Sequence, residues 1–351
     1  MPPLFRIKSC WSKAGIGTCT VIQHNAGPSL VLDLGATPNY GDALQASVIL
    51  LTHGHLDHVG AIFSHARAYA LQHSGVSATY YAPLDLVPLL QRAKECLEAL
   101  DSENDRTGPN KGGLPMQFIG VKPGDEFFLP IKKRLNGDTI FVRVFQTFHG
   151  GSPSVGYVVG VRKRSTLKKQ YVGMTSDELK ELTSRNLDIK ESIETLEVAY
   201  TGDTTVETFD QAPDTRSGLH LEQAYQCHYF LTETTMLDDV SRPRVHSIGH
   251  MHLLDVVDAV VPRVCHHLVL LHVSARYDAS TAMGWIADAI PSDLPCSVAI
   301  ASLDRVHQNF GGMVSNNGLL LVSAYKEQQN QKGQDREATK PSSNDIPSET
   351  L

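Results

Sequence analysis

Short runs of β-branched and other apolar residues alternate along the chain with segments of helical periodicity. The runs are typical of buried strands, and the periodic segments of helices that pack on a sheet. The predicted strands are 18–22, 30–34, 48–51, 140–148, 156–161, 198–201, 229–232, 268–273 and 297–301. The predicted helices are 59–74, 83–100, 176–184, 252–264 and 280–290. This alternation predicts a layered α/β fold.

Two segments depart from this alternation. Residues 162–197 are charged, poor in aromatic side chains and helix-prone, so we expect an insertion or arm between two core strands. Residues 326–351 contain no aromatic side chain and cannot bury enough apolar area to offset the entropy lost on ordering. The sequence therefore predicts one domain over 1–325 and a disordered C-terminal tail over 326–351.

The overall charge argues against a general binder of nucleic acid. With 31 basic and 38 acidic side chains the formal net charge is −7, whereas binding a polyanion needs positive charge at the contact. Positive charge is concentrated locally, at Arg162, Lys163, Arg164, Lys168 and Lys169 and in a smaller cluster at 132–134. The larger cluster is either a solvated loop or a surface for a phosphate backbone.

The cysteines and the apolar runs bear on the cell compartment. The six cysteines lie far apart without a CxxC pair, which suits reduced thiols in the cytoplasm better than a disulfide framework. A nuclear or organellar address stays open, because residues 1–32 carry basic side chains and no acid. No run of about 18 apolar residues occurs, so we expect no membrane-spanning helix.

The strongest chemical signal is THGHLDHVG at 52–60, which directly follows an apolar strand. His53, His55 and Asp57 alternate, so an extended segment would point them the same way, and His58 follows where a helix begins. Neutral imidazole and carboxylate are the ligands that divalent metals such as zinc prefer. Since an open catalytic zinc usually takes about three protein ligands, four such groups favour two metal ions over one.

Three further candidate ligands lie at the ends of predicted strands. His149 precedes two glycines, Asp203 lies in YTGDT, and His272 ends LVLLH. A lone histidine at a strand end is more often structural than a ligand. Together with the first motif, however, these residues supply five histidines and two aspartates. A dinuclear site with a bridging carboxylate can use that full set.

The order HxHxDH, strand-end His, GDT and final His resembles the metallo-β-lactamase superfamily. The resemblance implies an αββα sandwich, in which two β-sheets pack face to face with helices on the outer faces. The segment LHVSARY at 271–277 resembles tRNase Z, the endonuclease family that matures tRNA 3′ ends. ETTM at 233–236 is similar to the HEAT-like motif of that family, although Thr232 replaces its leading histidine. GHMH at 249–252, TGDTT and GYVVGVRKRSTLKKQYVG are similar to the plant short-form enzymes.

This resemblance implies a zinc-dependent endoribonuclease that removes the 3′ trailer from precursor tRNA and works as a homodimer. Its ligand sets would be His53, His55 and His149 for one Zn²⁺, Asp57, His58 and His272 for the other, with Asp203 bridging both. Attack on the scissile phosphorus would leave a 3′-hydroxyl on the tRNA and a 5′-phosphate on the trailer. The basic cluster within 162–197 would contact the tRNA backbone.

The leaving 3′ oxygen needs a proton, which a histidine oriented by a carboxylate can supply. The resemblance maps this pair onto Glu233 and His250, which form the implied catalytic set together with the ligand Asp57. His252 is a rival for His250, because it lies only two positions away. Asp33 is either a turn residue or a partner that orients a ligand imidazole.

Two other functions stay open. The metal motif alone also fits another hydrolase of the same fold, either a thioester hydrolase of the glyoxalase II type or a phosphodiesterase. A metal-free binding protein descended from an enzyme is disfavoured, because all seven ligand positions carry competent side chains. The SARY segment, Glu233 and His250 favour the nuclease.

Overall fold

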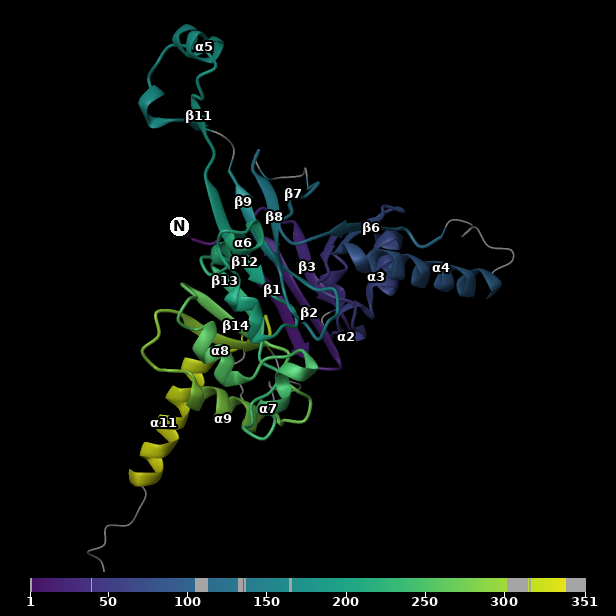
Figure 1. The fold of residues 1–351 in the computed structure, drawn as a ribbon, viewed down its shortest axis with the longest axis vertical. Helices are drawn as coiled ribbons and strands as arrows, with labels where there is room; N and C mark the ends of the chain where they lie inside the picture. Colours follow the sequence, from purple (N-terminus) through teal and green to yellow (C-terminus); the bar gives the residue numbers. More distant parts are fainter. Residues whose placement is uncertain are drawn as a thin grey trace, which may run out of the picture.

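The computed structural model describes residues 2–38, 40–104, 113–131, 135, 137–163, 166–301, 315 and 317–338. Arg164 and the basic cluster at 132–134 lie outside the described residues. Two β-sheets face each other in the middle of the molecule, and helices cover the outer face of each (Figure 1). The predicted αββα sandwich is therefore confirmed.

The first sheet has six strands in the order β1-β2-β3-β4-β5-β6. They are β1 (Phe5–Lys13), β2 (Gly17–His24), β3 (Ser29–Leu34), β4 (Val48–Leu50), β5 (Ala78–Pro83) and β6 (Met116–Val121). β1, β2 and β3 are antiparallel neighbours, whereas β3, β4, β5 and β6 run parallel. Helices α3 (Ile62–Gln72) and α4 (Val87–Asn104) connect parallel strands and cover the outer face of this sheet.

The second sheet has eight strands in the order β16-β15-β14-β13-β12-β9-β8-β7. They are β7 (Glu126–Phe128), β8 (Thr139–Gln146), β9 (Val155–Arg162), β12 (Glu194–Tyr200), β13 (Tyr229–Glu233), β14 (His267–Leu271), β15 (Ser297–Ala301) and β16 (Leu319–Leu321). β12 to β15 are parallel, so their carboxyl ends meet at one edge of the sheet. The helices on its outer face are α6 (Arg216–Ala224), α8 (Leu253–Ala259), α9 (Ala279–Ala289) and α11 (Val322–Ala338).

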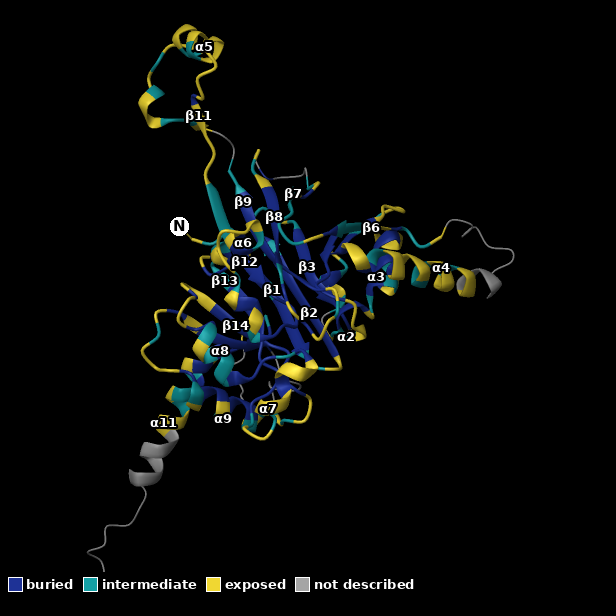
Figure 2. Cartoon of the chain, in the orientation of Figure 1, coloured by how far each residue is buried: buried dark blue, intermediate teal, exposed yellow. Residues whose placement is uncertain are grey.

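Strand β3 shows how the apolar core is divided. Leu30 and Leu32 pack in the cluster between the two sheets, whereas Val31 and Leu34 pack against the outer helices. Successive side chains of a strand point to opposite faces, so a strand covered on both sides must be apolar throughout. This is why 30–34 and 48–51 are continuous apolar runs in the sequence, and Figure 2 shows the central strands buried along their length.

Residues between β9 and β12 form an arm that projects from the sandwich (Figure 1). It contains the paired strands β10 (Thr166–Leu167) and β11 (Lys190–Glu191) and helix α5 (Ser176–Ser184), of which no residue is buried. Thr175 caps α5 through a capping box with Glu178. The insertion predicted over 162–197 corresponds to this arm, which Figure 2 shows as largely exposed, but its predicted ends are too wide, because Arg162 belongs to β9 and residues 194–197 belong to β12.

A network of two arginines and two glutamates fastens the base of the arm to the sheet. Arg162 lies 2.6 Å from Glu194 and 3.1 Å from Glu126, and Arg143 lies 2.7 Å and 2.8 Å from the same two carboxylates. The four side chains come from β7, β8, β9 and β12. Networks of this kind hold their members in place better than isolated surface pairs do.

Several element boundaries differ from the prediction. β1 is missing from the prediction because the charged Arg6 and Lys8 interrupt its apolar pattern, yet Phe5 and Ile7, which alternate with them, are buried. The helix predicted from residue 83 starts later, since Pro83 ends β5 and α4 begins at Val87. The remaining short helices are α1 (Tyr40–Ala43), α2 (Leu56–Val59) and α7 (Arg242–Val245).

The disorder predicted from residue 326 is wrong for 326–338, because α11 continues to Ala338. The start of this helix is held in the core, where Val322 and Tyr325 are buried, and Lys326 Nζ donates to the carbonyl of Ile290 at 2.7 Å. A helix anchored at one end can extend through polar residues of good helix propensity. Residues 339–351 lie outside the described part.

No helix among the described residues is long and apolar enough to cross a membrane.

Candidate metal centre

The candidate site lies where several strands end at one edge of the sandwich. The loop at 52–55 follows β4, and α2 then carries Asp57 and His58. His149 follows β8, Asp203 follows β12, and His272 follows β14. Loops at the carboxyl ends of parallel strands meet at one edge. The fold thereby brings together all seven predicted ligands, although they span residues 53 to 272.

One group of side chains consists of His53, His55, His149 and Asp203, whose ligand atoms all lie within 4.8 Å of one another. His149 Nε2 lies 3.1 Å from His55 Nδ1, and His53 Nε2 lies 3.7 Å from Asp203 Oδ2. The rings of His53 and His149 meet edge to face at 4.6 Å. Three imidazoles and a carboxylate that converge in this way form a donor set suited to zinc.

The other group consists of Asp57, His58 and His272. His272 Nε2 lies 3.2 Å from Asp57 Oδ2 and 3.3 Å from Asp203 Oδ2. His58 Nε2 lies 3.2 Å from the other oxygen, Asp203 Oδ1. The carboxylate of Asp203 therefore faces both groups. Asp57 is in the first turn of α2 rather than in the extended segment expected from the sequence, so the helix, not strand alternation, orients it.

Four buried polar atoms at the centre of the site have no hydrogen-bond partner: His53 Nε2, His58 Nε2 and both carboxylate oxygens of Asp203. Buried polar atoms are nearly always satisfied, and an unpaired buried carboxylate is especially costly. Four such atoms that face one another suit a shared cation better than four separate defects. The residues present thus fit the metal that the donor set suggests.

In His53, His58 and His149 the outward-facing Nδ1 is held by another group, which leaves Nε2 pointing inward. Nδ1 of His58 lies 2.7 Å from Asp33 Oδ2, and Nδ1 of His149 lies 2.5 Å from the carbonyl oxygen of Gly249. Nδ1 of His53 lies 3.1 Å from Thr52 Oγ1. Partners of this kind fix the tautomer and orientation of a metal-binding imidazole.

Asp33 is the most heavily bonded of these partners. Its carboxylate accepts hydrogen bonds from the backbone N–H and hydroxyl of Thr52 and from the hydroxyl of Tyr200, in addition to its contact with His58. Asp33 has a φ of +52°, a conformation that costs free energy for a non-glycine residue. Of the two interpretations left open from the sequence, the structure supports the one in which Asp33 orients an imidazole.

Two glycines are needed for the close approach of the loops. A Cβ on Gly202 would lie 2.4 Å from Thr52 Oγ1, and one on Gly249 would lie 2.6 Å from the backbone nitrogen of Gly150. Both glycines also have positive φ. Any larger residue at either position would push apart segments that carry His53, Asp203 and His149.

Glu233 and His250 lie beside the first group of ligands. His250 Nδ1 is 3.1 Å and 3.2 Å from the two oxygens of Glu233 and 3.9 Å from Asp203 Oδ2. Burial opposes a charge on His250, but the Glu233 carboxylate outweighs it and raises the pKa of His250 to about 9. Such a histidine keeps its proton at neutral pH, as a proton donor must.

The hydroxyl of Thr235 links this pair to the other ligands, a role that the sequence did not reveal. It donates a short hydrogen bond to Glu233 Oε2 and lies 3.0 Å from Nδ1 of His272. Thr235 lies within the HEAT-like segment at 233–236, so its position was visible in the sequence, but its contact with His272 was not.

The rival His252 is placed elsewhere. It is the N-cap of α8, where Nδ1 accepts from the backbone of Leu254 at 3.2 Å and Nε2 lies 3.2 Å from the carbonyl oxygen of Asp238. It is fully buried with both ring nitrogens engaged. The structure therefore brings His250, and not His252, to the cluster.

The electrostatics of the cluster depend on burial. Burial lowers the pKa of His53 well below its usual value, which leaves the neutral imidazole that a metal requires. Burial of Asp57 opposes its ionisation, but the hydrogen bond to His272 and the charge of His58 lower its pKa to about 2. The side chains of His53 and Asp57 thus have the protonation state of a metal ligand at neutral pH.

The predicted basic cluster is not brought to this site. Arg162 belongs to the network at the base of the arm, and Lys168 pairs with Asp188 at 3.1 Å. Lys169 is exposed in the arm, and Lys163 donates its backbone N–H to the carbonyl of Ile193 at 2.9 Å. Further pairs in the arm, such as Lys180 with Asp177, compensate its charge. The arm is therefore less positive than the run 162–169 suggests.

Comparison with known proteins agrees with this geometry. Residues 13–161 match the family model of the metallo-beta-lactamase superfamily. The chain is 30% identical over 269 residues to tRNase Z TRZ1 of Arabidopsis thaliana, covering 76% of this chain and 84% of that protein. It is 28% identical over 268 residues to the chloroplastic tRNase Z TRZ2 of the same plant, covering 76% and 67%.

Two crystal structures share the fold at low identity. A long form RNase Z from yeast has a TM-score of 0.52 at 11% identity and covers 94% of this chain and 43% of that one. Unliganded yeast PDE1 has a TM-score of 0.52 at 12% identity and covers 85% and 98%. The sandwich and the histidine cluster at its edge are those of a metallo-β-lactamase-fold protein. Within that class, the chain belongs to the tRNase Z family, which confirms the resemblance seen in its motifs.

Replacing Asp203 by asparagine keeps the size of the side chain and removes the charge that both groups face. We expect the metal affinity of Asp203→Asn to fall by about tenfold or more, since changes even outside the ligand shell have effects of that size. Elemental analysis of protein dialysed against buffered metal measures this. Asp210→Asn is the matched control, because Asp210 is exposed and lies outside the cluster. Wild-type metal content in Asp203→Asn would contradict the shared role of this carboxylate.

Proposed function

We propose that this chain is a zinc-dependent endoribonuclease that removes the 3′ trailer from precursor tRNA. The observation that carries the proposal is a single carboxylate, Asp203, facing two groups of metal-binding side chains, with a carboxylate–histidine pair beside them. A site of this kind suits phosphodiester hydrolysis, in which charge grows on the phosphoryl oxygens and a leaving oxygen needs a proton.

Within this proposal two Zn²⁺ ions bind per chain. His53, His55 and His149 would hold one ion, Asp57, His58 and His272 would hold the other, and Asp203, whose carboxylate faces both groups, would contribute to both. When bound, such a pair lowers the pKa of a shared water towards neutrality and neutralises developing charge. The chain contributes the orientation of the ligands, through Asp33, Thr52, Thr235 and the carbonyl of Gly249.

The proton for the leaving 3′ oxygen comes from His250. Glu233 accepts from His250 Nδ1, so the other ring nitrogen is free to donate towards the substrate. Glu233 Oε1 also accepts from the backbone N–H of Thr204, and Oε2 from that of Met251. These bonds fix the carboxylate, so the imidazole is oriented before substrate binds. The products are a tRNA with a 3′-hydroxyl and a trailer with a 5′-phosphate.

The proposal extends to a homodimer that acts in the cytoplasm. All six cysteines are free, which fits a reducing compartment. The projecting arm would contact the tRNA backbone away from the cut, with Lys169 exposed for that contact and Arg162 holding the base of the arm to the sheet. An arm of this reach suits a large substrate, whereas a thioester or a small phosphodiester would not use it.

Purified protein should cut a labelled precursor tRNA at the 3′ end of the mature sequence, and a chelator should stop the reaction until Zn²⁺ is returned. A gel that maps the cut measures this. His55→Ala should abolish cleavage because it removes a ligand, whereas the matched control His73→Ala should not, since His73 stacks on Tyr69 in α3. If the protein hydrolyses a thioester or bis-(p-nitrophenyl) phosphate but leaves precursor tRNA intact, the proposal is contradicted.

The pH dependence should follow the proton on His250. Its pKa is raised to about 9, so the donor form is present below that pH and is lost as the pH rises through it. Because Glu233 is the main group raising this pKa, Glu233→Gln should move the alkaline limb of the kcat profile to lower pH.

The control for this experiment is Glu222→Gln, which changes an exposed carboxylate far from the cluster in the same way. Metal content is measured alongside, because Glu233 and His250 lie within 4.8 Å of Asp203 and His149. An alkaline limb that stays in place in Glu233→Gln at unchanged metal content would remove His250 from the role of proton donor.

A further inference from the structure

A pocket of about 810 Å³ opens beside His149 and has no role in the chemistry described so far. Its walls come from the segments after β5, β6 and β8 and from residues 205–207 and 246. Among its lining residues are Leu84, Lys122, Phe148, Pro153, Glu207 and His246. Pockets of this size hold small organic groups, and the wall of this one combines apolar with polar side chains.

Phe148 is an exposed aromatic ring in this pocket, with 44% of its surface accessible. It is adjacent in sequence to His149, whose ring lies within the metal cluster. In the described part of the chain, the ring of Phe148 contacts no other ring and no cation. This exposed ring lies directly beside the metal cluster, where a ligand that stacks on it would bury it, which is favourable for an aromatic side chain.

The backbone holds Phe148 in this position from both sides. Its N–H donates to Thr208 Oγ1 at 2.9 Å, and its carbonyl accepts from the N–H of Thr205 at 2.8 Å. Thr208 is buried and also bonded to Thr204. The ring is therefore presented by a fixed backbone rather than by a loose loop, which lowers the entropy lost when a ligand stacks on it.

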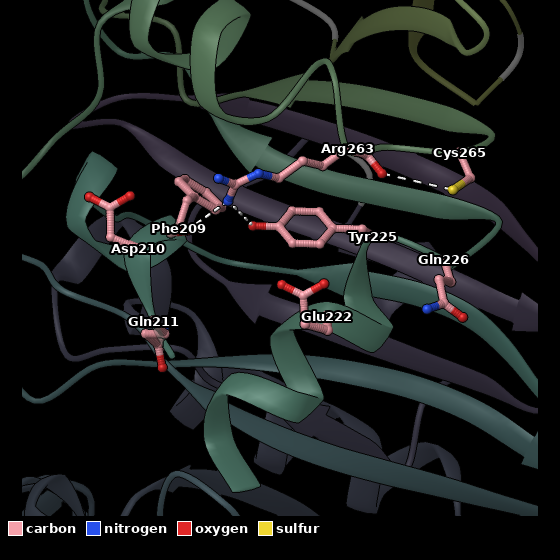
Figure 3. A pocket seen from close by; sticks show the side chains of 8 residues that line it. All are labelled: Phe209, Asp210, Gln211, Glu222, Tyr225, Gln226, Arg263 and Cys265. Atoms are coloured by element: carbon pink, nitrogen blue, oxygen red, sulfur yellow. Dashed lines mark hydrogen bonds between the residues drawn. The ribbon is translucent and has the colours of Figure 1, made fainter. Parts of the chain in front are cut away.

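A second pocket, of about 590 Å³, lacks these properties (Figure 3). Its cation, Arg263, donates to the carbonyl of Phe209 at 2.6 Å and to the hydroxyl of Tyr225 at 3.2 Å. Asp210 and Glu222 add negative charge to the rim. A base entering this pocket would find the face of Tyr225 already occupied by the guanidinium, and Phe209, the other aromatic residue of the lining, is buried.

We propose that Phe148 stacks on the unpaired base of the last tRNA nucleotide, the one on the 5′ side of the cut. This inference rests on the proposed function. His246 lines the pocket, and the chain runs on from it through Gly249 to His250. Gly249 lies close to the backbone of Gly150, which also lines the pocket. The proton donor and the pocket thus share one loop. The oxygen protonated by His250 belongs to the 5′ nucleotide, so it is the base of that nucleotide that reaches the pocket.

Stacking suits a general processing enzyme. Every base offers a π face, so an aromatic platform accepts any of the four without reading its edge. The platform would fix the position of the 3′ end while leaving the identity of its last base unrestricted. Phe148 acts here as a positioning residue, since it touches the substrate next to the reacting atoms and not at them.

The binding test uses holoenzyme and a mature-length tRNA whose last nucleotide is 2-aminopurine, which offers no scissile bond. Binding to wild type should quench its fluorescence, as stacking does. Phe148→Leu removes the ring and keeps an apolar side chain, so quenching should be lost and Kd should rise roughly tenfold, within the usual range for one stacked base. Phe148→Tyr keeps the ring and should behave as wild type.

The cleavage test compares precursor tRNAs that are abasic at the last tRNA nucleotide or at the first trailer nucleotide. Removing the last tRNA base should lower kcat/KM of wild type by about tenfold. For Phe148→Leu, kcat/KM should be the same on this abasic precursor as on the intact one, because the ring that the base would stack on is already absent. The assignment would be overturned if the losses in kcat/KM from Phe148→Leu and from removal of the last tRNA base were additive. It would also be overturned if Phe148→Leu made the enzyme insensitive to removal of the first trailer base instead. Wild type that cuts no precursor tRNA would instead refute the proposed function, so the two failures are separable.

Discussion

The buried carboxylate of Asp203 is the constraint on which the rest of the site depends. It is almost inaccessible to solvent, both of its oxygens lack a hydrogen-bond donor, and imidazoles from both groups face it. A carboxylate in that state is costly unless positive charge approaches it. The surrounding histidines can supply that positive charge when they are protonated. When they are neutral, they can instead bind metal cations that supply it. The arrangement of loops at this edge of the sandwich follows from the need to satisfy one buried anion.

The sandwich supplies the rigidity that such a site requires. The ligands stand on loops or, for Asp57 and His58, in the short helix α2, but each of these segments follows a strand whose side chains are buried on both faces. Backbone strain also occurs at this place, because Asp33 and His272 both have positive φ, at +52° and +59°. Strain of this kind persists only where surrounding contacts over-determine the conformation. Here the contacts are those of Asp33 with Thr52, His58 and Tyr200.

Much of the centre could be predicted from the sequence because its ligand types are rare side by side. HGHLDH has few packing explanations, and His149, Asp203 and His272 follow strands that the apolar pattern already predicts. The outer contacts could not be predicted in this way. Thr235 reaches His272 across 37 residues, and the carbonyl of Gly249 reaches His149 across 100, and no local pattern records such distances.

The errors in the fold have similar causes. Strand β1 was hidden because Arg6 and Lys8 break its apolar pattern, and α11 because its anchor at Val322 and Tyr325 lies before the polar segment that it extends. The partners of Arg162 and Lys168 could not be predicted either, because they come from distant or later segments, at Glu126, Glu194 and Asp188. Pairing between segments is the information that composition does not contain.

The most direct measurement is a crystal structure of the purified protein with anomalous scattering recorded at the zinc edge. Two anomalous peaks about 3.5–4 Å apart, with one oxygen of Asp203 directed at each or one shared by both, are the result that the account predicts. A single peak, or two peaks of which one lies outside coordinating reach of Asp203, would contradict it.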